Sequence, residues 1–230
     1  MALFSYLQRA QLLLNDTTAA VYNDADLITY TNLARQQVAA EAECVRNYTT
    51  LSVVSGTQVY AFSSITGLAS GVTSILNVRQ VNYSVASGYA NVTLRPFEWF
   101  NTWVFAQATP VPAAPSVWAQ YGQGATGSLY INVPDTSYTL NLDCACLPTA
   151  LALDTDTEAL PYPWTEAVPF YTSYYALMSE RKMDEAQQML DAYQQFMMRA
   201  RRGSNPSILP FNFEQHDDPM KATRLGLVSK

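Results

Sequence analysis

The spacing of apolar residues changes twice along the chain, and this change limits the folds that the chain can adopt. Residues 2–15 place apolar side chains three or four positions apart, as on one face of a helix. Between residues 49 and 148 the spacing becomes the alternation of β-strands, and from residue 161 it returns to helical spacing. The pattern therefore predicts an α+β fold, in which a β-rich middle separates two N-terminal helices from two C-terminal helices.

Each N-terminal helix is predicted to have one apolar side. In the first helix this side comprises Leu3, Leu7, Ala10 and Leu14. The second helix begins near Asp24 or Asp26, and either side chain could cap its first turn. Its apolar side comprises Leu27, Tyr30, Leu33, Ala34, Val38, Ala42 and Val45, and its polar side comprises Asn32, Arg35, Gln36, Gln37 and Glu43. We expect the second helix to pack on its apolar side alone, against the first helix or a neighbouring copy.

The middle of the chain predicts an antiparallel β domain of about five to seven strands. The sequence TTLSVVSGTQVYAF, residues 49–62, has a Ser-Gly-Thr turn between two strand-like runs, which predicts a hairpin. A break at Ser87-Gly88 separates the next two strand-like runs. Prolines 110, 112 and 115 predict an exposed, extended loop, because proline cannot donate a backbone hydrogen bond.

The C-terminal part predicts two helices and then a segment without periodicity. In the third helix Pro169 fits only in the first turn. The fourth helix spans residues 184–202, with Asp184 as its cap and Gly203 just beyond its end. Its apolar stripe comprises Ala186, Met189, Leu190, Tyr193, Phe196, Met197 and Ala200. Residues 204–230 predict either a disordered tail or an extended arm that becomes ordered on a partner; their apolar anchors favour the arm.

These patterns divide the chain into four predicted parts. Residues 1–48 and 149–203 form a helical domain, residues 49–148 form the β domain, and residues 204–230 form the arm. The first stretch after the β domain, residues 149–162, is a polar and acidic connector.

No arrangement of residues predicts catalysis, a bound metal or a cofactor. The single histidine, His216, lies in the arm, where no rigid neighbours would orient it. The Gly-rich run at 122–127 lacks the lysine of a phosphate loop and predicts a turn between strands. Asp154 with Asp156, or Glu158 with Glu166, could in principle serve a glycosidase, but they are better interpreted as solvated connector carboxylates.

The cysteines and aromatic residues are interpreted as packing residues. Cys144 and Cys146 share one strand face with Leu140 and Leu142, and with Cys44 they are too few for a disulfide scaffold. The aromatic residues considered as a sugar groove are Trp99, Trp103, Trp118, Trp164, Tyr171, Tyr174 and Tyr175, for which core or interface packing is the simpler interpretation.

The composition argues against several classes of partner. Charged residues make up only 14%, below the roughly 25% of ordinary soluble domains, and the chain has 15 tyrosines. Such a surface is either neutral or largely part of protein–protein interfaces, where tyrosine is enriched. We favour the second interpretation. A net charge of −6 with one basic run, at 199–202, argues against a DNA-reading surface.

No signal peptide or membrane span is evident, so we expect a product that is made and kept in the cytoplasm.

Several motifs together resemble a known family. The stretch LLLND is followed by YNDADLITYTNLARQQVA and then ECVRN, and this resembles the N-terminal part of tailed-phage head-to-tail adaptor proteins. The matching positions of the second helix are Asp26, Leu27, Asn32, Ala34 and Arg35. YINVPD at 130–135 and ALPYPW at 159–164 are also similar, and the order of elements agrees over nearly the whole chain.

The resemblance implies a structural role in the virion neck. It implies a ring, commonly of twelve copies, that docks below the portal of a podovirus-like capsid, extends the DNA channel, helps to retain the genome and provides a platform for the tail nozzle or fibres. The helices would build the ring, and DNA would pass without sequence-specific binding. Portal contact is carried over to the apolar part of the arm, namely Ile208, Leu209, Pro210, Phe211 and Phe213.

Three other functions remain open. The chain could be another neck or tail component such as a tail terminator, although the helix at 184–202 argues against this. It could be a virion-associated glycan hydrolase, which would need two carboxylates facing each other in a cleft. It could also be a carbohydrate-binding module on the β domain.

Overall fold

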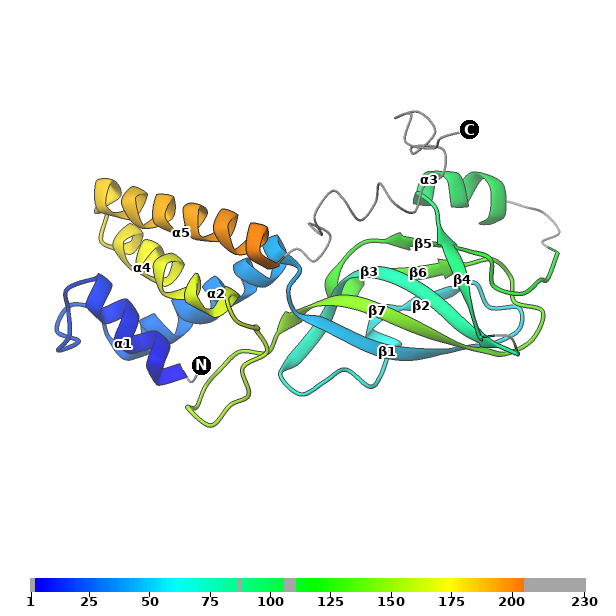
Figure 1. Cartoon of the computed structure of the whole chain (residues 1–230), viewed down its shortest axis with the longest axis horizontal. Coiled ribbons are helices and arrows are strands. Elements are labelled where there is room, and N and C mark those ends of the chain that lie inside the picture. Colours follow the sequence, from blue (N-terminus) through cyan, green and yellow to red (C-terminus); the bar gives the residue numbers. More distant parts are fainter. Residues whose placement is uncertain (1–2, 87, 106–110, 205–230) are drawn as a thin grey trace, which may run out of the picture.

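The computed structural model describes residues 3–86, 88–105 and 111–204, and it has a helical region at one end and a curled sheet at the other (Figure 1). The helical region contains α1 (Leu3–Leu13), α2 (Asp24–Ala42), α4 (Val168–Ser179) and α5 (Met183–Ser204). A short helix α3 (Phe97–Phe100) belongs to the sheet region. The predicted α+β class is confirmed, with the strands lying between α2 and α4 along the chain.

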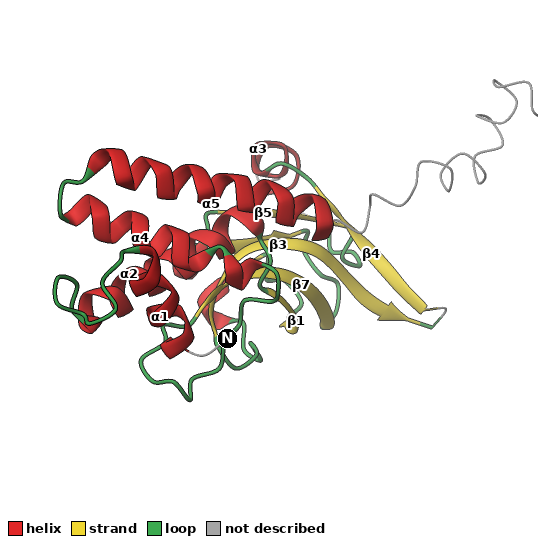
Figure 2. Ribbon diagram, turned by 60° about the vertical axis from the view of Figure 1, so that its left-hand side comes forward, coloured by secondary structure: helices red, strands yellow, loops and turns green. Residues whose placement is uncertain are grey.

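Helix α4 is the centre of the helical region, because α1, α2 and α5 all pack against it (Figure 2). Val168, Pro169, Thr172 and Ser173 are buried on this helix. Pro169 lies in the first turn, as predicted, where a missing N–H group costs no helical hydrogen bond. Polar Thr172 is tolerated in the core because its hydroxyl donates to the Val168 carbonyl, at 3.0 Å.

The apolar stripe of α5 is confirmed, but its predicted ends are wrong. Ala186, Tyr193, Met197 and Ala200 are buried. The helix begins at Met183, so Asp184 lies inside the first turn, where its charge suits the helix dipole without capping. At the other end the helix continues through Gly203 to Ser204, since a single glycine lowers helix stability by only about 1 kcal/mol.

The start of α2 also differs from the prediction. Asn23, rather than Asp24 or Asp26, is the N-cap, and its side-chain oxygen accepts from the Asp26 backbone N–H at 2.8 Å. The Asn23 amide group donates in turn to the Asp26 carboxylate at 2.7 Å. Both aspartates therefore lie in the first turn, where negative charge is favourable.

Seven strands form one sheet in the order β1-β7-β3-β4-β5-β6-β2. Their bounds are β1 (Arg46–Val53), β2 (Val59–Ala61), β3 (Val72–Val85), β4 (Gly88–Leu94), β5 (Val117–Tyr121), β6 (Ser128–Ile131) and β7 (Tyr138–Pro148). The strand number agrees with the prediction. The prediction of a wholly antiparallel domain is wrong at one pair, because β4 and β5 are parallel. A parallel pair needs a crossover, and the segment that contains α3 supplies it.

The predicted hairpin at 49–62 is wrong in its pairing, and its true partners explain the curl. β1 pairs with β7 and β2 pairs with β6, so the two strands are the opposite edges of the sheet. In a flat sheet those edges would be about 29 Å apart, because six strand spacings of about 4.8 Å separate them. The link from Val53 to Val59 can span at most about 22 Å. The sheet must therefore curl until its edges approach each other.

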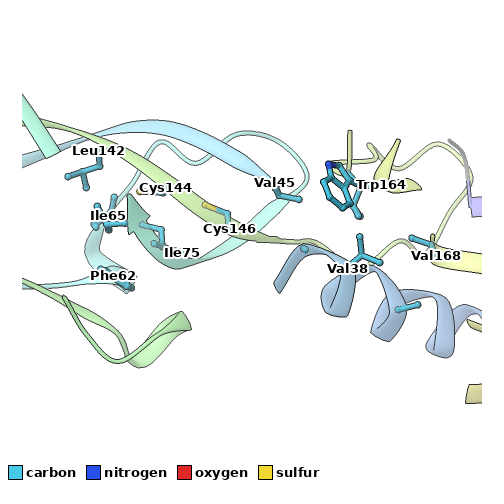
Figure 3. Close-up of a cluster of buried hydrophobic side chains, with 14 of the residues drawn as sticks. Val38, Val45, Phe62, Ile65, Ile75, Leu142, Cys144, Cys146, Trp164 and Val168 are labelled. Atoms are coloured by element: carbon cyan, nitrogen blue, oxygen red, sulfur yellow. The ribbon is translucent and has the colours of Figure 1, made fainter. Parts of the chain in front are cut away.

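One buried cluster runs from the sheet into the helices (Figure 3). Leu140, Leu142, Cys144 and Cys146 of β7 are fully buried in it, as predicted. Near the helical end, Val45, Val38 and Trp164 continue the same cluster. Because α2 joins β1 through only three residues, this shared core fixes how the two regions meet.

Candidate functional site

The residues predicted to contact the portal lie outside the part of the chain that the structure describes. These are Ile208, Leu209, Pro210, Phe211 and Phe213, and His216 lies there too. The candidate site is therefore built from the described surfaces of the helical and sheet regions.

The four carboxylates each accept a contact in the structure, but the interpretation as solvated loop groups is corrected only for Glu158 and Glu166, since Asp154 is exposed and Asp156 contacts its own loop. Asp154 accepts from the Phe4 backbone N–H at 2.9 Å, at the start of α1. Glu166 forms an ion pair with Arg9 of α1. Asp156 accepts from the backbone of its own loop, and these N–H groups hold its pKa below the usual value. Each carboxylate thus has a structural partner.

Glu158 has the most buried partner of the four. Its carboxylate receives a bidentate contact from Arg35 of α2, with Nε–Oε2 at 3.0 Å and Nη2–Oε1 at 2.7 Å. The exposed fractions of the two side chains are 1% for Arg35 and 7% for Glu158. The Tyr6 hydroxyl of α1 also donates to Glu158, at 2.8 Å, and burial together with this carboxylate raises the pKa of Tyr6. The pair therefore joins α1, α2 and the connector.

The same cluster reaches the end of the sheet. Arg35 Nη1 donates to the Thr149 carbonyl at 2.7 Å, just after β7. Asn32 accepts from the Leu151 N–H at 2.8 Å and donates to the Leu151 carbonyl at 2.9 Å. The sequence placed Asn32 and Arg35 on the polar side of the helix, so their position is a correction. Two of the positions that resemble the adaptor family, Asn32 and Arg35, thus belong to a polar hub around the buried Arg35–Glu158 pair. The sequence analysis missed this hub, because Glu158 lies 123 residues from Arg35.

The charges of the chain are divided unequally between the two regions. Residues 46–148 contain only six charged side chains, three of each sign: Arg46, Arg79, Arg95, Glu98, Asp135 and Asp143. The net charge of −6 therefore comes from the helical region and the connector, because the segment 205–230 also balances to zero. Two of the three arginines in the sheet are already paired, Arg46 with Asp143 and Arg79 with Glu43.

A glutamine fills a gap in the sheet. β4 pairs with the C-terminal part of β3 and then turns to pair with β5, so none of the described strands lies beside the first half of β3 on that side. Gln120 of β5 spans this gap: its oxygen accepts from the Val78 N–H at 2.9 Å and its amide group donates to the Leu76 carbonyl at 3.1 Å. A cavity of about 300 Å³ lies at the gap, beside the Arg79–Glu43 pair. Glu43 is the single carboxylate among the residues that line this cavity, so the lining lacks the pair that glycoside hydrolysis needs.

The tyrosines of α4 form an aromatic cluster with the neighbouring helices. Tyr171 packs on Tyr193 of α5, with ring centroids 4.6 Å apart. Tyr175 stacks on Tyr30 of α2 at 6.0 Å, and Tyr174 contacts both Tyr171 and Tyr175. All except Tyr193 are half-buried, so this cluster, called here the tyrosine face, presents ring surface to solvent.

A second aromatic surface lies on the sheet region. Phe97 of α3 contacts Tyr121 and Tyr130, at 4.6 and 4.9 Å. Arg95 lies over the ring of Trp99, 5.1 Å from its centroid. The outer side chains are exposed, namely Trp99, Trp103, Phe105 and Tyr121, and we call them the aromatic ridge. The other two tryptophans considered for a sugar groove, Trp118 and Trp164, lie in the core instead.

The cysteines are free thiols in a poorly solvated setting. Burial raises the pKa of Cys144 to about 12 and that of Cys146 to about 11, which makes both poor nucleophiles at neutral pH. Among the described residues, no group of three or more His, Cys, Asp or Glu side chains could hold a metal ion. No helix within that part of the chain is long and apolar enough to cross a membrane.

Comparison with known proteins places the chain in a family. A search of curated proteins gives no match. The model of the SU10 adaptor protein family matches residues 1–210, which include both regions of the fold and the Arg35 hub. The chain therefore belongs to the SU10 adaptor protein family, and it is a phage structural adaptor, a component of the virion.

Proposed function

We propose that the chain is the head-to-tail adaptor of a podovirus-like virion. Twelve copies form a ring below the portal, which extends the DNA channel, helps to retain the packaged genome and provides the attachment platform for the tail. The observation that carries this proposal is the match of an adaptor family over residues 1–210. The role is structural, without catalysis or a cofactor.

The helical region supports ring formation because it offers two different apolar patches. A closed ring joins one patch of a subunit to a different patch of the next. The tyrosine face is one patch, and the exposed side chains around α1, namely Phe4, Leu12 and Val21, provide another. On α4, Phe170 lines the groove beside α1, and Tyr171 lies about 100° around the helix from it. The two patches therefore lie on different sides of the helical region.

The distribution of charge supports a channel that DNA passes through without being held. Tight DNA binding requires many lysine or arginine contacts to phosphates. The sheet region is almost uncharged and the helical region is negative. The aromatic ridge is suited to a protein partner, since exposed Trp, Tyr and Arg are the side chains enriched at interfaces. We assign the ridge to a tail nozzle or tail fibre protein.

The arm is proposed to attach each subunit to the portal through Ile208, Leu209, Pro210, Phe211 and Phe213. The test is co-sedimentation of the purified chain with the portal of its own phage, comparing the full chain with a truncation that ends at residue 203. We expect the truncated chain to keep its helical circular dichroism signal, because the hub and core lie before residue 204, and to lose portal binding. Portal binding that survives truncation would contradict the role of the arm.

A further inference from the structure

A groove between α1 and α4 is open on the described surface of the helical region. It has a volume of about 300 Å³ and is lined by Arg9, Leu12, Leu13, Glu166, Pro169 and Phe170. Its walls are mostly apolar, and the Arg9–Glu166 ion pair lies at its rim. Leu12 is 66% exposed there. An apolar groove on a negatively charged helical region is suited to an uncharged apolar segment.

The chain itself contains such a segment, and it follows α5, which packs beside the groove. Residues 208–213, ILPFNF, carry four large apolar side chains and no charge. Phe170 in the groove packs against Phe196 of α5, with ring centroids 6.4 Å apart. Ser204 ends α5 eight residues beyond Phe196, which corresponds to about 12 Å along the helix.

These lengths allow the segment to return to the groove of its own subunit. From Ser204 to Phe211 an extended chain spans about 23 Å, and to Phe213 about 30 Å. Both spans exceed about 22 Å, which is the length of the path from the Ser204 Cα to the Phe170 ring along α5 and through the Phe196 side chain. Because the segment is tethered, its effective concentration at the groove is of millimolar order, so a modest affinity suffices to fill it.

We propose that in the unassembled subunit the groove between α1 and α4 holds residues 208–213 of the same chain. A consequence, which rests on the proposed function of the arm, is that the groove and the portal compete for the same apolar residues. Docking on the portal would then withdraw the segment and uncover Leu12 and Phe170 for the neighbouring subunit. Ring closure would thereby be coupled to arrival at the portal.

Disulfide trapping in the full chain tests the contact. Leu12→Cys is combined with Asn212→Cys, which leaves Phe211 and Phe213 in place, and the purified protein is oxidised with copper phenanthroline. A disulfide requires Cα atoms within about 7 Å. The matched control combines Asn212→Cys with Met198→Cys. Met198 is exposed and closer to residue 212 along the chain, but it lies about 200° around α5 from Phe196 and so points away from the groove.

We expect the groove pair to form an intramolecular disulfide several-fold faster than the control pair. Adding Phe211→Ser and Phe213→Ser should slow disulfide formation in the groove pair to the rate of the control pair. Equal rates for the two pairs would overturn the proposal, because they would mean that the segment has no preferred site. A disulfide that links two chains would also overturn it and would assign the groove to a neighbouring copy.

Repeating the oxidation with purified portal separates this inference from the proposed function. A lower yield for the groove pair in the presence of portal supports both the docking and the competition. If portal leaves the disulfide yield unchanged, the segment still docks in the groove of its own subunit. That result would contradict the proposed role of the arm at the portal.

Discussion

The helical and sheet regions each contain an arginine–carboxylate pair, and the two pairs differ in their surroundings. In the helical region Arg35 and Glu158 are 1% and 7% exposed, and the pair joins α1, α2 and the connector. In the sheet region Arg46 and Asp143 are 46% and 29% exposed, and they link neighbouring strands that already share a ladder. The ion pair of the helical region is therefore part of a buried polar hub, whereas the ion pair of the sheet lies at its surface.

This difference suits the two regions to different tasks. A buried charge pair specifies which helices meet, because a wrong partner would leave a charge without compensation. Such specificity suits the ring proposed above, in which this region would present defined patches to neighbouring copies. The sheet has an almost uncharged exterior and a packed interior, so its outer side chains can serve a partner without disturbing its core.

The largest predicted effect comes from breaking the hub. Arg35→Met removes the bidentate partner of Glu158 and leaves that carboxylate buried, which should lower the free energy of unfolding by about 3–5 kcal/mol. Urea denaturation followed by far-UV circular dichroism measures it. As a control, Arg35→Met combined with Glu158→Leu should recover part of the loss, because no charge is then left buried. A loss below about 1 kcal/mol in the single variant would mean that the hub does not hold the region together.

A smaller effect is expected where the sheet depends on a polar side chain. Gln120→Leu leaves the Val78 N–H and the Leu76 carbonyl without their partner, which should cost about 1–3 kcal/mol. Gln123→Leu is the matched control, since Gln123 is exposed and donates only to the Asn77 side chain. That control should change the free energy of unfolding by less than about 0.5 kcal/mol. Equal denaturation midpoints for the two variants would contradict the claim that Gln120 stabilises the sheet by filling the gap beside β3.

A third prediction concerns acid. The backbone N–H groups of Tyr22, Val21 and Ala20 donate to Asp16 and hold its pKa below the usual value. Its contribution to stability is complete above the unfolded-state pKa of about 4 and disappears as the pH falls through the lowered folded-state pKa. Asp16→Asn should therefore lose less stability than the natural chain between pH 5 and pH 3, as measured by thermal melting. If the melting temperatures of the two proteins fell by the same amount between pH 5 and pH 3, Asp16 would not be a source of acid sensitivity.

The smallest effect belongs to the exposed pair of the sheet. Arg46→Ala should lower the free energy of unfolding by no more than about 1 kcal/mol, because solvent already screens this pair. The loss should shrink further in 1 M salt. The comparison with Arg35→Met tests whether burial separates the two regions, and similar losses in both variants would remove that distinction.

Local patterns predicted the parts of the fold that depend on neighbours in sequence. The stripe of α5 and the buried cysteines of β7 follow from one residue period each, and both are confirmed. The first-turn position of Pro169 follows from its missing N–H group. The division into domains and the ring remain predictions.

The errors arose where a distant residue decides the outcome. Arg35 lies on the polar side of its helix by periodicity, yet it is buried because Glu158 comes from the connector. The run at 49–62 has the pattern of a hairpin, yet its two strands pair with β7 and β6, because the curled sheet brings its edges together. No local signal marks Gln120, whose function depends on a gap between strands. The candidate portal residues stay a prediction outside the described structure, namely Ile208, Leu209, Pro210, Phe211 and Phe213.

The most direct test of the adaptor role is negative-stain electron microscopy of the purified chain, alone and mixed with its portal. The account predicts rings that stack coaxially on the portal, formed either by the chain alone or only once the portal is present. A chain that stays monomeric and leaves the portal undecorated would contradict the account.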